Sequence, residues 1–160
     1  MRREDLRLRL EERGAEVAFH DPHGAAFAED GHQRHGVSLT DEELARANIA
    51  ELVAHAASRG NFVRLDMEES TFVDATLRVF RALRENGHEN VGTVLQSYLY
   101  RSPADLEALL DLAPNLRFVK GAYLEPSTVA YPEKKDVDAA YARLVERSLE
   151  AGGFTAVATH

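Results

Sequence analysis

Residues 91–120 read VGTVLQSYLYRSPADLEALLDLAPNLRFVK, and this stretch decides the fold class. The stretch 91–96 predicts a strand, the leucines after Ser102 have helical spacing, and 116–120 predicts a second strand. Ser102 is the expected N-cap of the helix, because a proline and an aspartate follow it in the first turn. Strands joined through a helix are expected to pair in parallel, since a parallel connection needs a long crossover. The stretch therefore predicts an α/β fold.

The alternation of helix and strand continues on both sides of this stretch. Thr40 and Glu43 form a capping box at the start of the first clear helix. The further predicted elements are helices at 40–60, 71–87 and 136–151 and strands at 61–66 and 154–158. Two architectures fit about four parallel strands, a doubly wound sheet and a partial (β/α)8 TIM barrel. A closed barrel takes about 250 residues, so as a barrel the chain is roughly half of one.

The composition indicates about one soluble globular domain. The 160 residues are 44% hydrophobic and carry a net charge of −8, which argues against nucleic-acid binding because that needs a concentrated basic surface. The absence of cysteine excludes disulfides, thiolate metal ligands and a cysteine nucleophile. No apolar run is long enough to span a membrane, and the N-terminus lacks the apolar core of a signal peptide. A cytoplasmic location is therefore expected.

The first part of the chain is patterned differently from the rest. Residues 1–37 are weakly patterned, and we interpret them as an aberrant N-terminal segment ahead of a patterned region at 38–160. Residues 14–37 show no helical or strand periodicity, so no strand is expected there. Two His-x-x-His pairs, at 20–23 and 32–35, lie in this segment. Because no periodic scaffold orients them, we predict a disordered, histidine-rich stretch and no metal site.

Each of the four predicted strands ends in a polar group. In both architectures the working site lies at the carboxyl ends of parallel strands. The polar residues at these ends are Asp66, Gln96, Lys120, and Thr159 with His160. One polar strand end is common where a strand meets solvent, but four in series favour a shared functional site at this edge of the sheet.

Two charged residues, Asp66 and Arg117, narrow the chemistry of this site. Asp66 is the first of three acidic residues within four positions. We interpret Glu68 and Glu69 as acids in the first turn of the next helix, where they suit the positive end of the helix dipole. Asp66 then remains as the acid of the site. Arg117 lies in the middle of an apolar strand. A buried guanidinium is unfavourable unless an anion pairs with it. Arg117 therefore predicts an anionic ligand or cofactor.

Lys120 has two interpretations. It could form a Schiff base with a carbonyl substrate, as a desolvated lysine at a barrel strand end can. It could instead bind a phosphate or carboxylate through its charge, which is the commoner role. Gly121 and Ala122 follow it and remove side-chain bulk where a large ligand could approach the backbone.

Four segments of the chain, in this order, resemble those of one enzyme family. They are FVRLDMEE at 62–69, VLQSYL at 94–99, LRFVKGAY at 116–123 and AVATH at 156–160. Together they resemble the monofunctional bacterial proline dehydrogenases, which are FAD-dependent (β/α)8-barrel enzymes. The resemblance covers about residues 40–160 and implies that the chain is part of such a barrel.

The resemblance implies a role for each matching residue. It places Asp66 at the family's active-site aspartate and Arg117 beside flavin N5, where the reduced flavin is the anion that this arginine needs. It implies contacts to FAD for Met67, Gln96, Arg117, Lys120, Gly121, Ala122, Thr159 and His160. Tyr123 is expected on the same wall, and the Schiff-base role of Lys120 becomes less favoured.

The resemblance also implies a reaction and its partners. The family oxidises L-proline to 1-pyrroline-5-carboxylate, the first step of proline catabolism, by transferring a hydride to flavin N5. The electrons then pass to a membrane quinone. The implied location is cytoplasmic, with peripheral contact at the inner membrane.

Two features of the family lie outside the matching segments. Family members have an earlier strand with a lysine that meets the site aspartate, and 14–37 contains neither a predicted strand nor a lysine. They also continue past the position of His160 to paired arginines that bind the proline carboxylate. We therefore interpret the chain as an internal fragment. Two alternatives are a truncated product that cannot turn over proline alone and, less favoured, an aldolase or lyase that uses Lys120.

Overall fold

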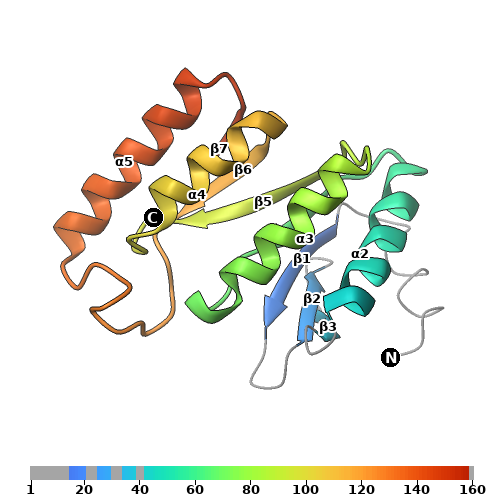
Figure 1. Cartoon of the computed structure of the whole chain (residues 1–160), viewed down its shortest axis with the longest axis horizontal. Helices are drawn as coiled ribbons and strands as arrows, with labels where there is room; N and C mark the ends of the chain where they lie inside the picture. Colours follow the sequence, from blue (N-terminus) through green and yellow to red (C-terminus); the bar gives the residue numbers. More distant parts are fainter. Residues whose placement is uncertain (1–14, 21–24, 30–33, 39–41, 159–160) are drawn as a thin grey trace. The chain divides into compact units, whose positions relative to one another are not determined.

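The computed structural model describes residues 15–20, 25–29, 34–38 and 42–158 (Figure 1). The chain forms two compact units. Unit 1 consists of Met1–Glu68 and Phe72–Gly92, and unit 2 consists of Glu69–Thr71 and Thr93–His160.

The sheet of unit 1 contains three strands that the sequence did not predict. They are β1 (Ala15–His20), β2 (Ala25–Glu29) and β3 (Arg34–Ser38). These strands pair antiparallel in the order β3-β2-β1, and β1 pairs in parallel with β4 (Val63–Asp66). The expectation of a disordered, strand-free stretch at 14–37 is therefore wrong. Each new strand has five or six residues, and its hydrogen bonds come from neighbouring strands, which periodicity along the chain cannot detect.

The two helices of unit 1 follow the predicted spacing. They are α2 (Glu42–Ala57) and α3 (Val73–Glu85), and a short 3-10 helix, η1 (Ser70–Phe72), directly precedes α3. Their buried residues recur at helical intervals and are Ala45, Ile49, Leu52, Val53 and Ala56 in α2 and Val73, Thr76, Val79, Phe80 and Leu83 in α3. The Asn90 side chain joins the end of α2 to the start of β4, because it donates to the carbonyls of Val53 and Asn61 at 3.0 Å each.

Unit 2 holds three parallel strands with helices between them. The strands are β5 (Val91–Gln96, within unit 2 from Thr93), β6 (Asn115–Val119) and β7 (Phe154–Val157), with β6 in the middle. The helices are α4 (Ser102–Leu109), the 3-10 helix η2 (Leu110–Leu112) and α5 (Lys134–Glu150). All residues of β5 are buried, and the bounds predicted for this strand, 91–96, are correct.

The start of α4 differs from its prediction. Arg101 is the N-cap residue instead of Ser102, and no side chain caps the helix. The Ser102 hydroxyl donates to the carbonyl of Gln96 at 2.5 Å, and Asp105 pairs with Arg101 at 2.7 Å. These bonds hold the first turn of α4 at the end of β5. The other predicted N-cap, Thr40, lies outside the described residues.

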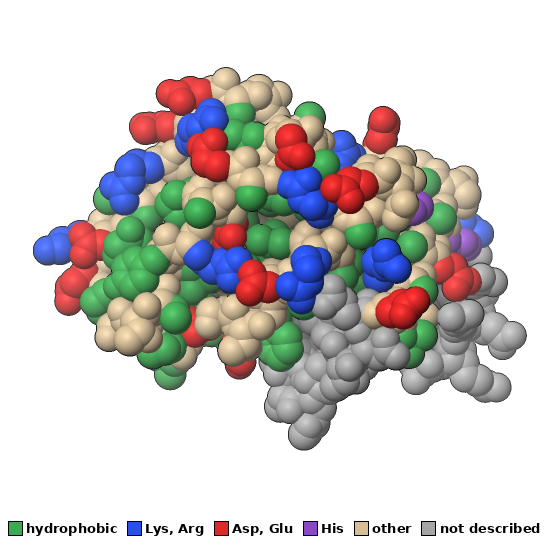
Figure 2. All heavy atoms as spheres, viewed as in Figure 1, with side chains coloured by type: hydrophobic (Ala, Val, Ile, Leu, Met, Phe, Trp, Pro, Cys, Tyr) green, Lys and Arg blue, Asp and Glu red, His purple; other side chains and the backbone are tan. Residues whose placement is uncertain are grey.

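Acidic and basic side chains are mixed over the face of the molecule that Figure 2 shows. An ion pair joins α5 to α4, because Arg147 donates two hydrogen bonds of 2.6 and 2.8 Å to the carboxylate of Glu107. Within the described ranges, no helix is both long and apolar enough to cross a membrane.

Candidate functional site

Strands β5 and β6 bring two predicted site residues onto one face of their sheet. Gln96 lies opposite Val119, and Arg117 lies opposite Val94. Side chains two positions apart on a strand share a face, and so do paired residues of neighbouring parallel strands. Gln96 and Arg117 therefore project from the same face. Gln96 is 2% exposed, whereas Arg117 is half-buried.

Lys120 lies at the end of β6 but contacts α5. Its Nζ atom is 2.7 Å from Oδ1 of Asp138, and Lys134 of the same helix pairs with the other oxygen of that carboxylate. Hydrogen bonds from Lys120, which has the larger effect, and from Lys134 hold the pKa of Asp138 below its usual range. The Lys120 amine is thus directed to the helix side of the sheet, while Gln96 and Arg117 share the other side.

The backbone turn at Gly121 is shaped by the ring of Tyr98. Gly121 has φ +114°, a conformation that favours glycine. A Cβ atom at this position would lie 2.4 Å from carbon atoms of the Tyr98 ring. The Tyr98 N–H also donates to the carbonyl of Lys120 at 2.9 Å. The missing side chain at Gly121 therefore makes room for Tyr98, a packing role that the sequence did not reveal.

The Tyr98 hydroxyl is buried and stays protonated. Burial raises the pKa of Tyr98, and the nearby carboxylates of Glu125 and Glu69 raise it further. The hydroxyl oxygen has no hydrogen-bond partner among the residues that the structure describes. Beyond the turn, Ala122 is exposed and Tyr123 is half-buried.

Asp66 ends β4 in unit 1, and its neighbour orients its carboxylate. The Met67 N–H donates to Oδ1 of Asp66 at 2.9 Å, and Met67 is 6% exposed. The interpretation of Glu68 and Glu69 as first-turn helix acids is wrong, because the next helical turn begins only at Ser70. Glu68 is buried and Glu69 exposed in the segment before that turn.

Other predicted residues lie elsewhere or beyond the described ranges. Thr159 and His160 lie outside the described residues, as do His23 and His32. The remaining histidines of the two pairs, at positions 20 and 35, lie in β1 and β3. Within the described part of the chain, no three His, Asp or Glu side chains are grouped so that they could hold a metal ion.

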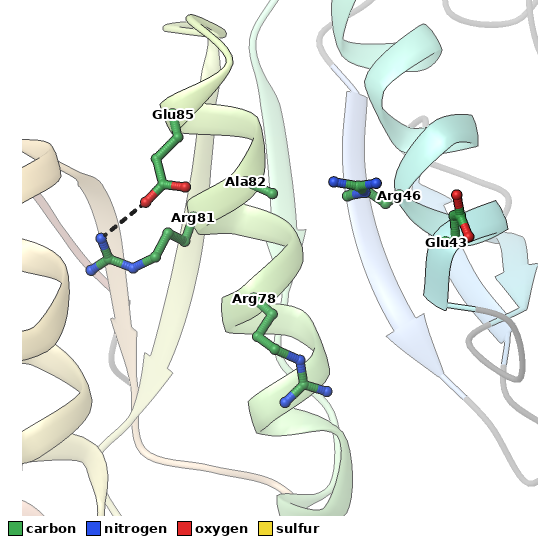
Figure 3. A pocket seen from close by; sticks show the side chains of 6 residues that line it. All are labelled: Glu43, Arg46, Arg78, Arg81, Ala82 and Glu85. Carbon is green, nitrogen blue, oxygen red and sulfur yellow. Dashed lines mark hydrogen bonds and ion pairs between the residues drawn. The ribbon is translucent and has the colours of Figure 1, made fainter.

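Unit 1 has a separate hollow between α2 and α3 (Figure 3). Its volume is about 640 Å³, and it is lined by Glu43, Arg46, Arg78, Arg81, Ala82 and Glu85. Arg81 and Glu85 form an ion pair of 3.4 Å across one helical turn. None of the predicted site residues lines this hollow.

A family model for proline dehydrogenase matches residues 4–160. The chain belongs to the proline dehydrogenase family. The match begins well before residue 40, so it extends into the N-terminal segment that the recognised motifs did not cover. The division of the chain at residue 38 stays a prediction.

Curated proline dehydrogenases share substantial identity with the chain. The enzyme of Deinococcus radiodurans is 58% identical over 126 residues, which are 78% of this chain and 41% of that protein. Proline dehydrogenase 1 of Bacillus subtilis is 40% identical over 125 residues, again 78% of this chain and 41% of the relative. The chain therefore spans about two fifths of the length of the curated relatives that it matches.

A solved structure shows the same fold. Proline utilization A from Bdellovibrio bacteriovorus, inactivated by N-propargylglycine, matches with a TM-score of 0.65 and 27% identity. The match covers 72% of this chain and 14% of that protein. Together with the parallel strands and intervening helices, it confirms the predicted α/β fold as a partial (β/α)8 barrel.

Proposed function

We propose that this chain carries part of the flavin site of a proline dehydrogenase. The enzyme oxidises L-proline to 1-pyrroline-5-carboxylate with FAD and passes the electrons to a quinone, with peripheral contact at the inner membrane. Family membership supports the proposal. The observation that carries it is that Gln96 and Arg117 project from one face of the sheet in unit 2.

The chemistry of these two side chains suits a flavin ring. The Gln96 amide both donates and accepts hydrogen bonds, which matches the alternating polar edge of an isoalloxazine. The Arg117 guanidinium is a permanent cation and stabilises negative charge on a reduced ring. FAD, when bound, supplies the hydride acceptor for the oxidation of proline. Gln96 therefore orients the ring in this proposal, and Arg117 acts on its charge.

Asp66 is proposed as the acid of the active site, and Met67 as a backbone contact to the flavin. The hydrogen bond from the Met67 N–H holds one carboxylate oxygen of Asp66 in place. A carboxylate whose orientation is set in this way can itself orient groups on the substrate side.

Lys120, Gly121 and Ala122 are proposed to contact the ribityl and phosphate part of FAD, together with Thr159 and His160. Lys120 shares the carboxylate of Asp138 with Lys134, so two cations meet one anion and leave a net positive charge. This charge favours a phosphate. The same ion pair weighs against an imine-forming Lys120, because the amine that would attack a carbonyl is held against Asp138.

Flavin binding by the purified chain tests the proposal. We expect the wild-type chain to quench flavin fluorescence and Arg117→Ala to bind FAD about tenfold more weakly, since a cation is lost beside the ring. Arg143→Ala, which removes an exposed arginine from α5, is the matched control. Equal affinity of Arg117→Ala and Arg143→Ala contradicts the role of Arg117. A wild-type chain that binds no FAD contradicts the whole proposal.

Two further assays separate the alternatives. Proline-dependent dye reduction by the FAD-loaded chain indicates an active enzyme, whereas bound FAD without dye reduction indicates a product that cannot turn over proline alone. Borohydride trapping of Lys120 with a carbonyl substrate indicates the aldolase or lyase.

A further inference from the structure

One carboxylate in unit 2 joins two segments that lie 55 positions apart in the chain. The Ser70 N–H donates to Oε1 of Glu125 at 2.6 Å, and the Ser70 hydroxyl donates to Oε2 at 2.7 Å. Hydrogen bonds to an ionised acceptor are short and roughly twice as strong as neutral ones. The Glu125 carboxylate therefore accepts hydrogen bonds from both the N–H and the hydroxyl of Ser70. We refer to these two bonds as the Glu125 clamp.

The loop that carries Glu125 is supported at its other end. The Tyr131 N–H donates to the carbonyl of Tyr98 at 2.8 Å, and the Tyr100 N–H donates to that of Val129 at 3.0 Å. The rings of Tyr100 and Tyr131 meet edge to face, with centroids 4.5 Å apart. These contacts attach the loop between β6 and α5 to the segment after β5, so Glu125 extends from a supported loop.

The places of the two partners in the sequence indicate what the clamp does. Ser70 comes three residues after Met67, which follows the proposed site acid. Glu125 comes three residues after Ala122, the last residue of the proposed cofactor-binding run. Both chain segments that the clamp joins therefore lead directly from residues with a proposed role in the flavin site.

The clamp also lies beside the residue that shapes the cofactor-binding run. Glu125 acts electrostatically on Tyr98, whose ring occupies the space where a Cβ of Gly121 would lie. If the Glu125 loop moves, we therefore expect the position of Gly121 to change as well, both through the connecting backbone and through the Tyr98 ring.

We propose that Glu125 is a positioning residue of the flavin site. By holding Ser70, it anchors the chain that follows Met67 to the loop that follows Ala122. The inference rests on the proposed function, because it concerns the same FAD-binding residues. It adds a residue that lies outside the four segments at 62–69, 94–99, 116–123 and 156–160 and that acts through Ser70 and the loop.

Hydrogen exchange and FAD titration of the purified chain test this role. Glu125→Ala removes both hydrogen bonds, whereas Glu125→Gln keeps an acceptor for the Ser70 N–H and loses the charge. Glu107→Ala is the matched control, because its carboxylate also accepts two short bonds, from Arg147. We expect Glu125→Ala to speed amide exchange at Ser70 and to weaken FAD binding about tenfold, or ~1.4 kcal/mol. Glu125→Gln is expected to recover part of the loss, and Glu107→Ala to match wild type.

The outcomes distinguish this inference from the proposed function. If wild type binds FAD and Glu125→Ala binds it as well as Glu107→Ala does, the positioning role is wrong. Unchanged exchange at Ser70 in Glu125→Ala also overturns it, because the clamp then does not hold the segment. If wild type binds no FAD, the proposed function fails and the positioning role fails with it. Should Glu125→Ala not fold, Ser70→Ala takes its place with an expected weakening of about threefold, and affinity equal to wild type overturns the inference.

Discussion

The face of the β5–β7 sheet that packs against α5 differs from the face that carries Gln96 and Arg117. On the α5 side, the hydroxyls of Ser148 and Thr155 form a 2.8 Å hydrogen bond, and Thr155 lies opposite Leu116. Arg117 follows Leu116 directly but points to the other face, because side chains alternate along a strand. In β6, a residue on the face that packs against α5 and a residue proposed to act on a flavin are therefore adjacent in sequence.

The largest effect is expected from the buried phenylalanine on the α5 side. Phe118 is 0% exposed, and Phe118→Ala is expected to lower the free energy of unfolding by about 3–5 kcal/mol because packing is lost and a cavity remains. Urea unfolding measures this loss. Val157, its partner on β7, is 58% exposed, so Val157→Ala is expected to lose less than about 1 kcal/mol. Equal losses would show that the burial of Phe118 does not set the size of the loss.

A smaller effect is expected at the turn after β6, where Gly121 and Gly87 form a matched pair. Both glycines have positive φ, but nothing lies within 4 Å of a Cβ built on Gly87. Gly121→Ala is expected to destabilise the chain by about 1–3 kcal/mol more than Gly87→Ala, because its methyl group overlaps the Tyr98 ring. Thermal and urea unfolding measure the difference. The excess should disappear when Tyr98 is also replaced by alanine, and its persistence would rule out the ring as the cause.

The smallest effect concerns the charge cluster at Asp138, on the α5 side. Lys120 and Lys134 lower the pKa of Asp138 in the folded state. A carboxyl whose folded pKa is depressed adds stability above its unfolded pKa of about 3.9 and loses that stability as the pH falls through the folded value. The wild-type melting temperature should therefore fall more between about pH 7 and about pH 3 than that of Asp138→Asn. Glu146→Gln, at an exposed position of the same helix, should follow wild type, and parallel curves for Asp138→Asn would show that the cluster adds no stability.

Local patterns predicted the elements whose burial follows a regular period. The strand predicted over 91–96 coincides with β5, and the helix predicted over 71–87 contains α3 at Val73–Glu85. The pattern failed for β1, β2 and β3, because short strands are stabilised by pairing with neighbours and leave only a brief alternation in the sequence. It also failed for Ser102, whose hydroxyl binds the Gln96 carbonyl instead of capping α4.

For the candidate site, the amino-acid order alone identified the α/β class, the polar strand ends and the family motifs, because these depend on residue types at fixed local spacing. The structure was needed to show that Arg117 and Lys120 lie on opposite sides of the sheet. Lys120 is assigned to the α5 side by its contact with Asp138, which α5 supplies. The Tyr98–Gly121 contact and the Glu125 clamp needed the folded chain as well. Such contacts join residues far apart in sequence, and whether those residues meet depends on every strand, helix and turn that lies between them.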